Sequence, residues 1–154
     1  MQFTTLKGNK IGVNLKPYEV KWKEKTRSKF QDRIKAFFFK YFKKLSWFEE
    51  VPLQGAGLTR LKWDFVCIFL DENGKEQLVF CECQGKQHDS INLKFHKSVD
   101  DLHSQAMRDE LKVLFAAKNS KFPVIEIHPE DEPLTLEKFR EYYPFLPVDK
   151  ENQL

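Results

Sequence analysis

Two carboxylates stand in the middle of apolar segments, where charged side chains are uncommon. Asp64 lies within residues 61–70 and Glu82 within residues 77–84. Burying an ionised carboxylate is unfavourable unless a cation, a hydrogen-bond network or a metal accompanies it, so the pair marks a candidate site. Gln84, two residues after Glu82, shares its strand face. Two carboxylates and an amide oxygen are hard ligands that suit Mg²⁺ or Mn²⁺ better than Zn²⁺.

The residues that follow Glu82 add further chemical groups. Gly85 permits a close backbone approach, Lys86 adds a cation, and His88 and His96 can titrate near neutral pH. A purely structural alternative remains open, in which the histidines pack their loop and the two acids pair with nearby cations (Arg60, Lys62 or Lys86). A zinc site built on Cys81 and Cys83 is disfavoured because both thiols should face away from Glu82.

The apolar segments predict an antiparallel meander of three strands over residues 47–53, 61–70 and 77–84. The connections at 54–57 and 71–75 are rich in turn residues. Strict alternation would put Trp63 and Phe65 on one face of the second strand and Asp64 and Val66 on the other. Both faces are apolar, which is typical of a sheet covered by helices on both sides.

Helical periodicity predicts helices at residues 28–45, 101–118 and 134–143, with a further strand at 122–128. Ser28 and Gln31 resemble a capping box at the start of the first helix. The element order α-β-β-β-α-β-α indicates an α/β class with a mixed sheet. We expect a basic N-terminal arm over residues 1–25 with one short strand at 10–15, a single domain over 26–146, and a C-terminal tail over 147–154.

Charge is distributed unevenly along the 154 residues. Residues 1–62 carry 15 basic and 5 acidic side chains, and residues 63–154 carry 11 and 18. A basic front half is typical of a surface for nucleic acid, although a solvated lysine-rich helix face would look the same. No apolar run reaches the roughly 18 residues of a membrane span, and the first residues lack the apolar core of a signal peptide. We therefore expect a soluble, cytoplasmic protein without a membrane partner.

Cysteine usage is consistent with a reducing compartment. Cys67, Cys81 and Cys83 all lie in apolar strand segments, where reduced and buried thiols are common. A disulfide scaffold is therefore not expected.

An ordered set of short motifs resembles the PD-(D/E)XK nuclease superfamily over about residues 12–145. The similarity is closer to small phage-encoded proteins related to very-short-patch-repair and homing endonucleases. The superfamily core is an α-β-β-β-α-β unit, with an acid on the second strand and an acid-x-Lys motif on the third. The matching residues are Arg27-Ser28-Lys29-Phe30-Gln31, Glu49-Glu50-Val51-Pro52, Asp64, the run from Glu82 to His88, Phe95-His96-Lys97, Gln105, Arg108-Asp109, Lys112 and Glu126-Ile127.

This resemblance implies a Mg²⁺- or Mn²⁺-dependent DNA endonuclease with a restriction-endonuclease-like core and a covering C-terminal helix. The implied metal ligands are Asp64, Glu82, the Cys83 carbonyl and Glu50. The implied catalytic residues are Asp64, Glu82, Gln84, His88 and Lys112. The implied DNA contacts are Lys21, Lys23, Lys25, Arg27, Lys29, Arg33, Lys86, His96, Gln105 and Arg108.

The chain departs from the family pattern at Gln84, where the family has a lysine. Gln105, Asp109 and Lys112 form one polar stripe on the second long helix, so Lys112 or Lys86 is a candidate replacement. A surface network of Arg108, Asp109 and Lys112 is the alternative reading of the stripe. The departure also leaves room for a catalytically inactive nucleic-acid-binding protein, or for a structural interaction protein. Cutting both strands of a duplex would require a homodimer or two successive nicks.

Overall fold

The computed structural model of the chain describes residues 1–53, 58–84 and 99–152. Its centre is a four-stranded sheet in the order β3-β4-β5-β6. Strands β3 (Ser46–Leu53), β4 (Leu58–Leu70) and β5 (Glu76–Cys83) pair antiparallel, and β6 (Ile125–Ile127) pairs parallel to β5. The predicted meander and the mixed sheet are confirmed. Strand β6 is shorter than the segment 122–128 predicted for it.

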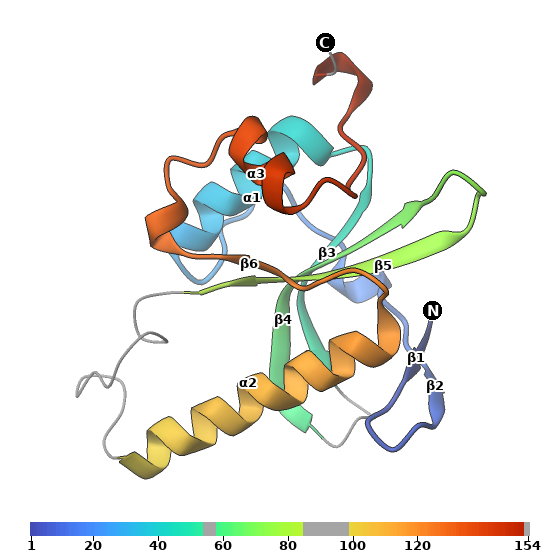
Figure 1. Cartoon of the computed structure of the whole chain (residues 1–154), viewed down its shortest axis with the longest axis vertical. Helices are drawn as coiled ribbons and strands as arrows, with labels where there is room; N and C mark the ends of the chain where they lie inside the picture. The colour runs from blue at the N-terminus through green and yellow to red at the C-terminus, as the bar shows by residue number, and fades with distance from the viewer. Residues whose placement is uncertain (54–57, 85–98, 153–154) are drawn as a thin grey trace.

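Helices cover both faces of this sheet (Figure 1). Helices α1 (Lys29–Phe42) and α3 (Leu136–Tyr142) lie on one face, and α2 (Val99–Asn119) lies on the other. The side chain of Ser28 accepts a hydrogen bond from the Gln31 backbone N–H, as expected of a helix N-cap, and Thr135 caps α3 in the same way. No helix in the described part of the chain combines the length and apolar character that crossing a membrane requires.

The first core cluster lies between the sheet and the helices α1 and α3. Phe38 is fully buried there; its ring stacks on Trp47 with centroids 4.2 Å apart and meets the Phe65 ring edge-on at 5.4 Å. The Trp47 indole Nε1–H donates to the Phe42 carbonyl oxygen at 2.9 Å, which satisfies its polar atom. Phe139 of α3 completes the layer. Aromatic packing therefore fixes α1, and with it the residues at its start.

The second core cluster lies on the opposite face and includes the N-terminus of the chain. Phe3, in the hairpin of β1 (Gln2–Thr4) and β2 (Lys10–Gly12), packs on Phe80 and Phe115. The Asn119 side chain both accepts from the Thr4 N–H and donates to the Thr4 carbonyl. An arm with one short strand was predicted here, whereas the structure has two strands with Phe3 in the core.

The end of the chain is also packed more closely than predicted. Val148 and Asp149, in the expected tail, are both buried. The Asp149 carboxylate accepts from the backbone N–H groups of Lys43 and Lys44, just after α1 ends, at 3.0 and 3.1 Å. These two N–H donors satisfy the buried carboxylate. The C-terminal segment therefore supports the end of α1.

Both outer edges of the sheet carry bonds to other parts of the chain. Along β3, the Val20 N–H donates to the Trp47 carbonyl at 3.0 Å, beside a bridge between Glu19 and Phe48. Along β6, the Tyr143 hydroxyl accepts from the Glu126 N–H and donates to the Glu126 carbonyl, both at 3.1 Å. These contacts occupy edge groups that would otherwise be open to another strand.

The inside–outside alternation of β3 reverses at Glu50. This residue has φ +52°, a left-handed conformation that is uncommon for a residue with a side chain. Before it, Trp47 belongs to the first core cluster; after it, Val51 belongs to the second. Trp63, which pairs with Val51, joins the second cluster as well, so the prediction that it shares a face with Phe65 is wrong. Strict alternation fails because the backbone turns at Glu50.

We expect Phe38→Ala to lower the free energy of unfolding by about 3–5 kcal/mol, because it removes a fully buried ring at the centre of the first cluster. The matched control is Phe39→Ala on the same helix, where the side chain is 45 % exposed and the loss should stay below about 1 kcal/mol. Urea unfolding of both variants measures the difference. Equal losses would contradict the assignment of Phe38 to the core.

Candidate functional site

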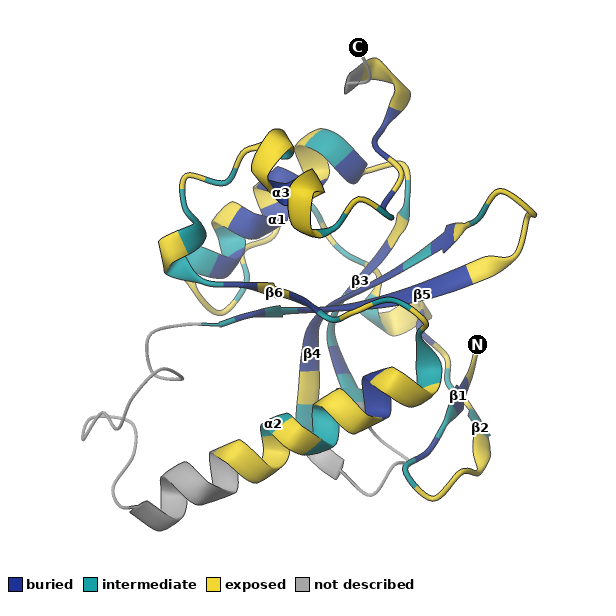
Figure 2. Cartoon of the chain, in the orientation of Figure 1, coloured by how far each residue is buried: buried dark blue, intermediate teal, exposed yellow. Residues whose placement is uncertain are grey.

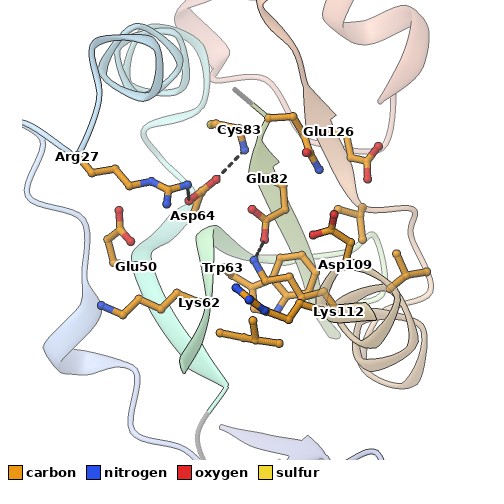
Figure 3. A pocket seen from close by; sticks show the side chains of 15 residues that line it. Arg27, Glu50, Lys62, Trp63, Asp64, Glu82, Cys83, Asp109, Lys112 and Glu126 are labelled. Atoms are coloured by element: carbon orange, nitrogen blue, oxygen red, sulfur yellow. Dashed lines mark hydrogen bonds and ion pairs between the residues drawn. The ribbon is translucent and has the colours of Figure 1, made fainter. Parts of the chain in front are cut away.

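Four carboxylates, one from each strand of the sheet, line a single pocket of about 220 Å³ on the α2 side (Figure 3). They are Glu50 of β3, Asp64 of β4, Glu82 of β5 and Glu126 of β6. Arg27, just before α1, and residues of α2 close the pocket on either side. The predicted pair Asp64 and Glu82 therefore lies within a longer row of acids.

Strand register accounts for this row. Glu49 pairs with Phe65 and Val51 with Trp63, so Glu50 stands opposite Asp64 on the neighbouring strand. Across the next boundary, Phe65 pairs with Cys81, which places Glu82 one step further on, beside Asp64. Glu82 in turn pairs directly with Glu126 of β6. Like charges on adjacent strands repel, so the row requires positive charge from elsewhere in the molecule.

Asp64 is held on both of its carboxylate oxygens. Oδ2 accepts from the Cys83 backbone N–H at 2.8 Å, and Oδ1 forms an ion pair with Arg27 Nη2 at 2.9 Å. Asp64 is only 2 % exposed, which makes it a buried acid with two specific partners. Arg27 was predicted to contact DNA, whereas here its guanidinium reaches into the pocket (Figure 3).

Glu82 has its cation from the opposite side. Lys112 Nζ of α2 donates to Glu82 Oε1, and both side chains are largely buried. The same ammonium lies 5.2 Å from the centre of the Trp63 ring, a cation–π geometry. Lys112, one of the two candidate replacements for the family lysine, therefore lies at Glu82. Asp109, one turn earlier on α2, lines the pocket as well.

Burial and the neighbouring Asp64 raise the pKa of Glu82 to about 9, against the opposing effect of Lys112, whose ammonium favours the ionised carboxylate. Positive charge that approaches Glu82 lowers this pKa and favours the ionised carboxylate.

A polar chain links Arg27 to Glu50. Arg27 Nε donates to Gln31 Oε1 at 3.1 Å, and Gln31 Nε2 donates to Glu50 Oε1 at 3.1 Å. Gln31 is completely buried, so its amide orientation is set by these two partners. The left-handed backbone of Glu50 lies at the end of this chain. Strained backbone of this kind is concentrated at functional sites, and here it turns a strand residue towards the pocket.

The remaining predicted residues fall into three groups. Cys83 and Gln84 line the pocket, and the Gln84 N–H donates to the Ile127 carbonyl at 2.8 Å. Lys86, His88 and His96 lie outside the described residues, and Gln105 lies in α2 without a described side chain. The other predicted DNA contacts of the first half are exposed, and Arg33 is also paired with Glu132 at 2.7 Å. Arg108 lines the pocket. The exposed ones are Lys21, Lys23, Lys25, Lys29 and Arg33.

Sequence reasoning missed three members of the site: Gln31, Trp63 and Glu126. Gln31 was taken as a capping residue, which accounts for its backbone and not for its side chain. Trp63 was taken as part of the core, yet its Nε1 is buried without a hydrogen-bond partner. Glu126 was quoted only within the Glu126-Ile127 motif, without a role, although its alternation with Ile125 and Ile127 in a short strand also sets it apart.

The donor set of the pocket fits a hard divalent cation. The oxygens of Asp64 and Glu82 lie side by side, and Asp64 is one of the causes that raise the Glu82 pKa. Within the described residues no three His, Cys, Asp or Glu side chains form a group that could hold a metal ion. Asp64 and Glu82 are paired with Arg27 and Lys112 instead. The thiols of Cys81 and Cys83 belong to the first core cluster, and burial raises the pKa of Cys81, so they do not supply a zinc site here.

Comparisons of the chain with protein-family models, with curated proteins and with solved structures find no match. Function is therefore inferred from the residues of the pocket and from their geometry.

We expect Lys112→Met to lower the free energy of unfolding by roughly 1–3 kcal/mol, because Glu82 loses its ammonium partner inside the protein. The double variant Lys112→Met/Glu82→Gln should recover part of this loss, since it removes the unpaired charge. Lys118→Met, on the exposed surface of the same helix, serves as the control. Chemical unfolding of the four proteins tests the coupling. A double variant no more stable than Lys112→Met would contradict it.

Proposed function

We propose that the chain is a metal-dependent DNA endonuclease with a PD-(D/E)XK-like core. The observation that carries the proposal is the position of Asp64 and Glu82 side by side on adjacent strands, with Lys112 in contact with Glu82. Two acids and a lysine in one pocket are the groups that metal-assisted phosphodiester hydrolysis requires.

The order of the elements supports the same proposal. Helix α1, the meander β3-β4-β5, helix α2 and strand β6 follow one another along the chain. This sequence of elements corresponds to the α-β-β-β-α-β unit of the superfamily, with Asp64 on the second strand and Glu82 on the third. Fold likeness alone does not establish activity, so the site residues carry the greater weight.

Each residue of the pocket can be given a role. Asp64, Glu82 and the Cys83 carbonyl would hold Mg²⁺ or Mn²⁺, with Glu50 next to them on β3. The bound ion would polarise the scissile phosphate and lower the pKa of a water. Lys112 would take the place of the lysine that Gln84 replaces, because its ammonium already lies at Glu82 and can stabilise charge developing on the phosphate.

The exposed basic residues support DNA as the proposed substrate. Lys21, Lys23 and Lys25 precede α1, and Arg108 lines the pocket from the α2 side. These cations would neutralise phosphates along the bound DNA. Binding should then weaken as salt rises, with a log–log slope of about −0.9 for each phosphate contact on duplex DNA.

We expect the protein to nick supercoiled plasmid in Mg²⁺ or Mn²⁺ and not in EDTA. Asp64→Asn and Glu82→Gln should reduce nicking to the EDTA background, because each replaces a negatively charged metal ligand with a neutral amide. Glu76→Gln changes an exposed acid at the other end of β5 and should leave nicking intact. Agarose gels that separate relaxed from supercoiled plasmid measure nicking by the wild type and the three variants. Nicking that survives in Asp64→Asn and Glu82→Gln would overturn the site assignment.

We expect Lys112→Ala to lose about 100-fold or more in nicking rate, because it removes the cation beside the reacting phosphate. Lys86→Ala, which changes the other candidate lysine, should remain active, and Lys118→Ala is a control on the exposed side of α2. Single-turnover rates on a labelled duplex separate the chemical step from binding. If the Lys112 and Lys86 variants both keep full activity, neither lysine replaces the family residue.

A second candidate function is an inactive nucleic-acid-binding protein. Two observations favour it: Gln84 stands where the family has a lysine, and internal cations already pair with Asp64 and Glu82. If the protein only binds nucleic acid, it should bind DNA without nicking it, and Asp64→Ala should bind DNA as tightly as the wild type. The plasmid assay, combined with a binding assay at low salt, separates the two functions.

A further inference from the structure

We infer that Arg27 competes with the divalent cation for Asp64, and that the cation releases Arg27 to bind a phosphate of the DNA. This inference rests on the proposed function, since it concerns the same pocket. It adds a second state to the site, in which one internal cation is exchanged for an external one.

Arg27 occupies one carboxylate oxygen of Asp64 in the structure. Its Oδ2 is fixed by the Cys83 N–H, so Oδ1 is the oxygen that can face an incoming ion. Arg27 Nη2 stands 2.9 Å from that oxygen. A cation that coordinates Oδ1 and the guanidinium that donates to it would occupy the same space. Binding of one therefore requires the departure of the other.

The two internal cations differ in how far their side chains are exposed to solvent. The Arg27 side chain is 57 % exposed, whereas the Lys112 side chain is 15 % exposed. An exposed guanidinium exchanges its partner for water with little loss, and a buried ammonium does not. Lys112 also rests on the Trp63 ring. Arg27 is therefore the cation that leaves, and Lys112 the one that stays.

The position of Arg27 in the chain limits where its side chain can move after it leaves Asp64. Arg27 precedes Ser28, the N-cap of α1, so its backbone is anchored while its long side chain extends to Asp64 (Figure 3). Its Nε–H remains within reach of Gln31 Oε1, which restricts the swing. A guanidinium fork matches two phosphate oxygens, and the phosphate chain of DNA is the anion such a pocket would receive. Arg27 would then link metal entry to substrate binding.

The test measures Mn²⁺ binding to the full chain without DNA, by calorimetry and by the electron paramagnetic resonance signal of free Mn²⁺. Arg27→Met should bind Mn²⁺ at least about threefold more tightly than the wild type, because Asp64 no longer has a competing partner. Lys29→Met makes the same change in net charge on a nearby exposed residue and should leave the affinity unchanged.

A second measurement uses the unmutated protein, so it does not depend on Arg27→Met remaining folded. Addition of Mg²⁺ should shift the Arg27 Nε–H resonance in ¹⁵N NMR and leave the Arg33 resonance, which belongs to the pair with Glu132, in place. With Mg²⁺ bound, Arg27→Met should also lose affinity for a short duplex relative to Lys118→Met, which removes an exposed lysine outside the predicted DNA contacts.

The outcomes separate the two proposals. If Mn²⁺ binds equally to the wild type, Arg27→Met and Lys29→Met, and the Arg27 resonance does not move, the competition is overturned while the metal site stands. If neither the wild type nor Arg27→Met binds Mn²⁺, the proposed metal-dependent function is overturned, and the competition with it.

Discussion

The architecture depends on neutralising two adjacent carboxylates that the sheet itself cannot neutralise. Asp64 and Glu82 lie on neighbouring strands with Glu50 and Glu126 on either side of them. The cations paired with Asp64 and Glu82 come from outside the sheet: Arg27 lies just before α1, and Lys112 lies on α2. The two helices therefore do more than cover apolar faces, because each delivers a cation to a fixed place.

That delivery is accurate because each helix is anchored by aromatic packing away from the pocket. Phe38 and Trp47 hold α1 against the sheet, which fixes Gln31 in its first turn and Arg27 just before the helix. Phe115 holds the C-terminal part of α2 against Phe80, one turn beyond Lys112. Stability and chemistry thus use different parts of the same helices, so the polar residues of the pocket can differ without loss of the core.

The sequence predicted those features that follow from burial and period. Asp64 and Glu82 were recognisable as acids inside apolar strands. Lys112 was recognisable as a candidate site residue because it belongs to a polar stripe on a helix. The reversal at Glu50 was not predictable, because a left-handed residue within a strand leaves no mark on a pattern of alternating side chains, and the face of Trp63 was assigned wrongly for that reason. Pairing between distant residues, as in Arg27 with Asp64, depends on tertiary geometry that spacing does not encode.

The covered sheet edges restrict how two copies of the chain could meet. Tyr143 occupies the backbone groups of Glu126 on one side, and the segment at Val20 occupies those of Trp47 on the other. Assembly by adding a strand of one molecule to the sheet of another would first have to remove these contacts. A pair of molecules that cut opposite strands of a duplex would therefore associate through side chains on their helical or loop surfaces, leaving each sheet and each row of acids a separate unit.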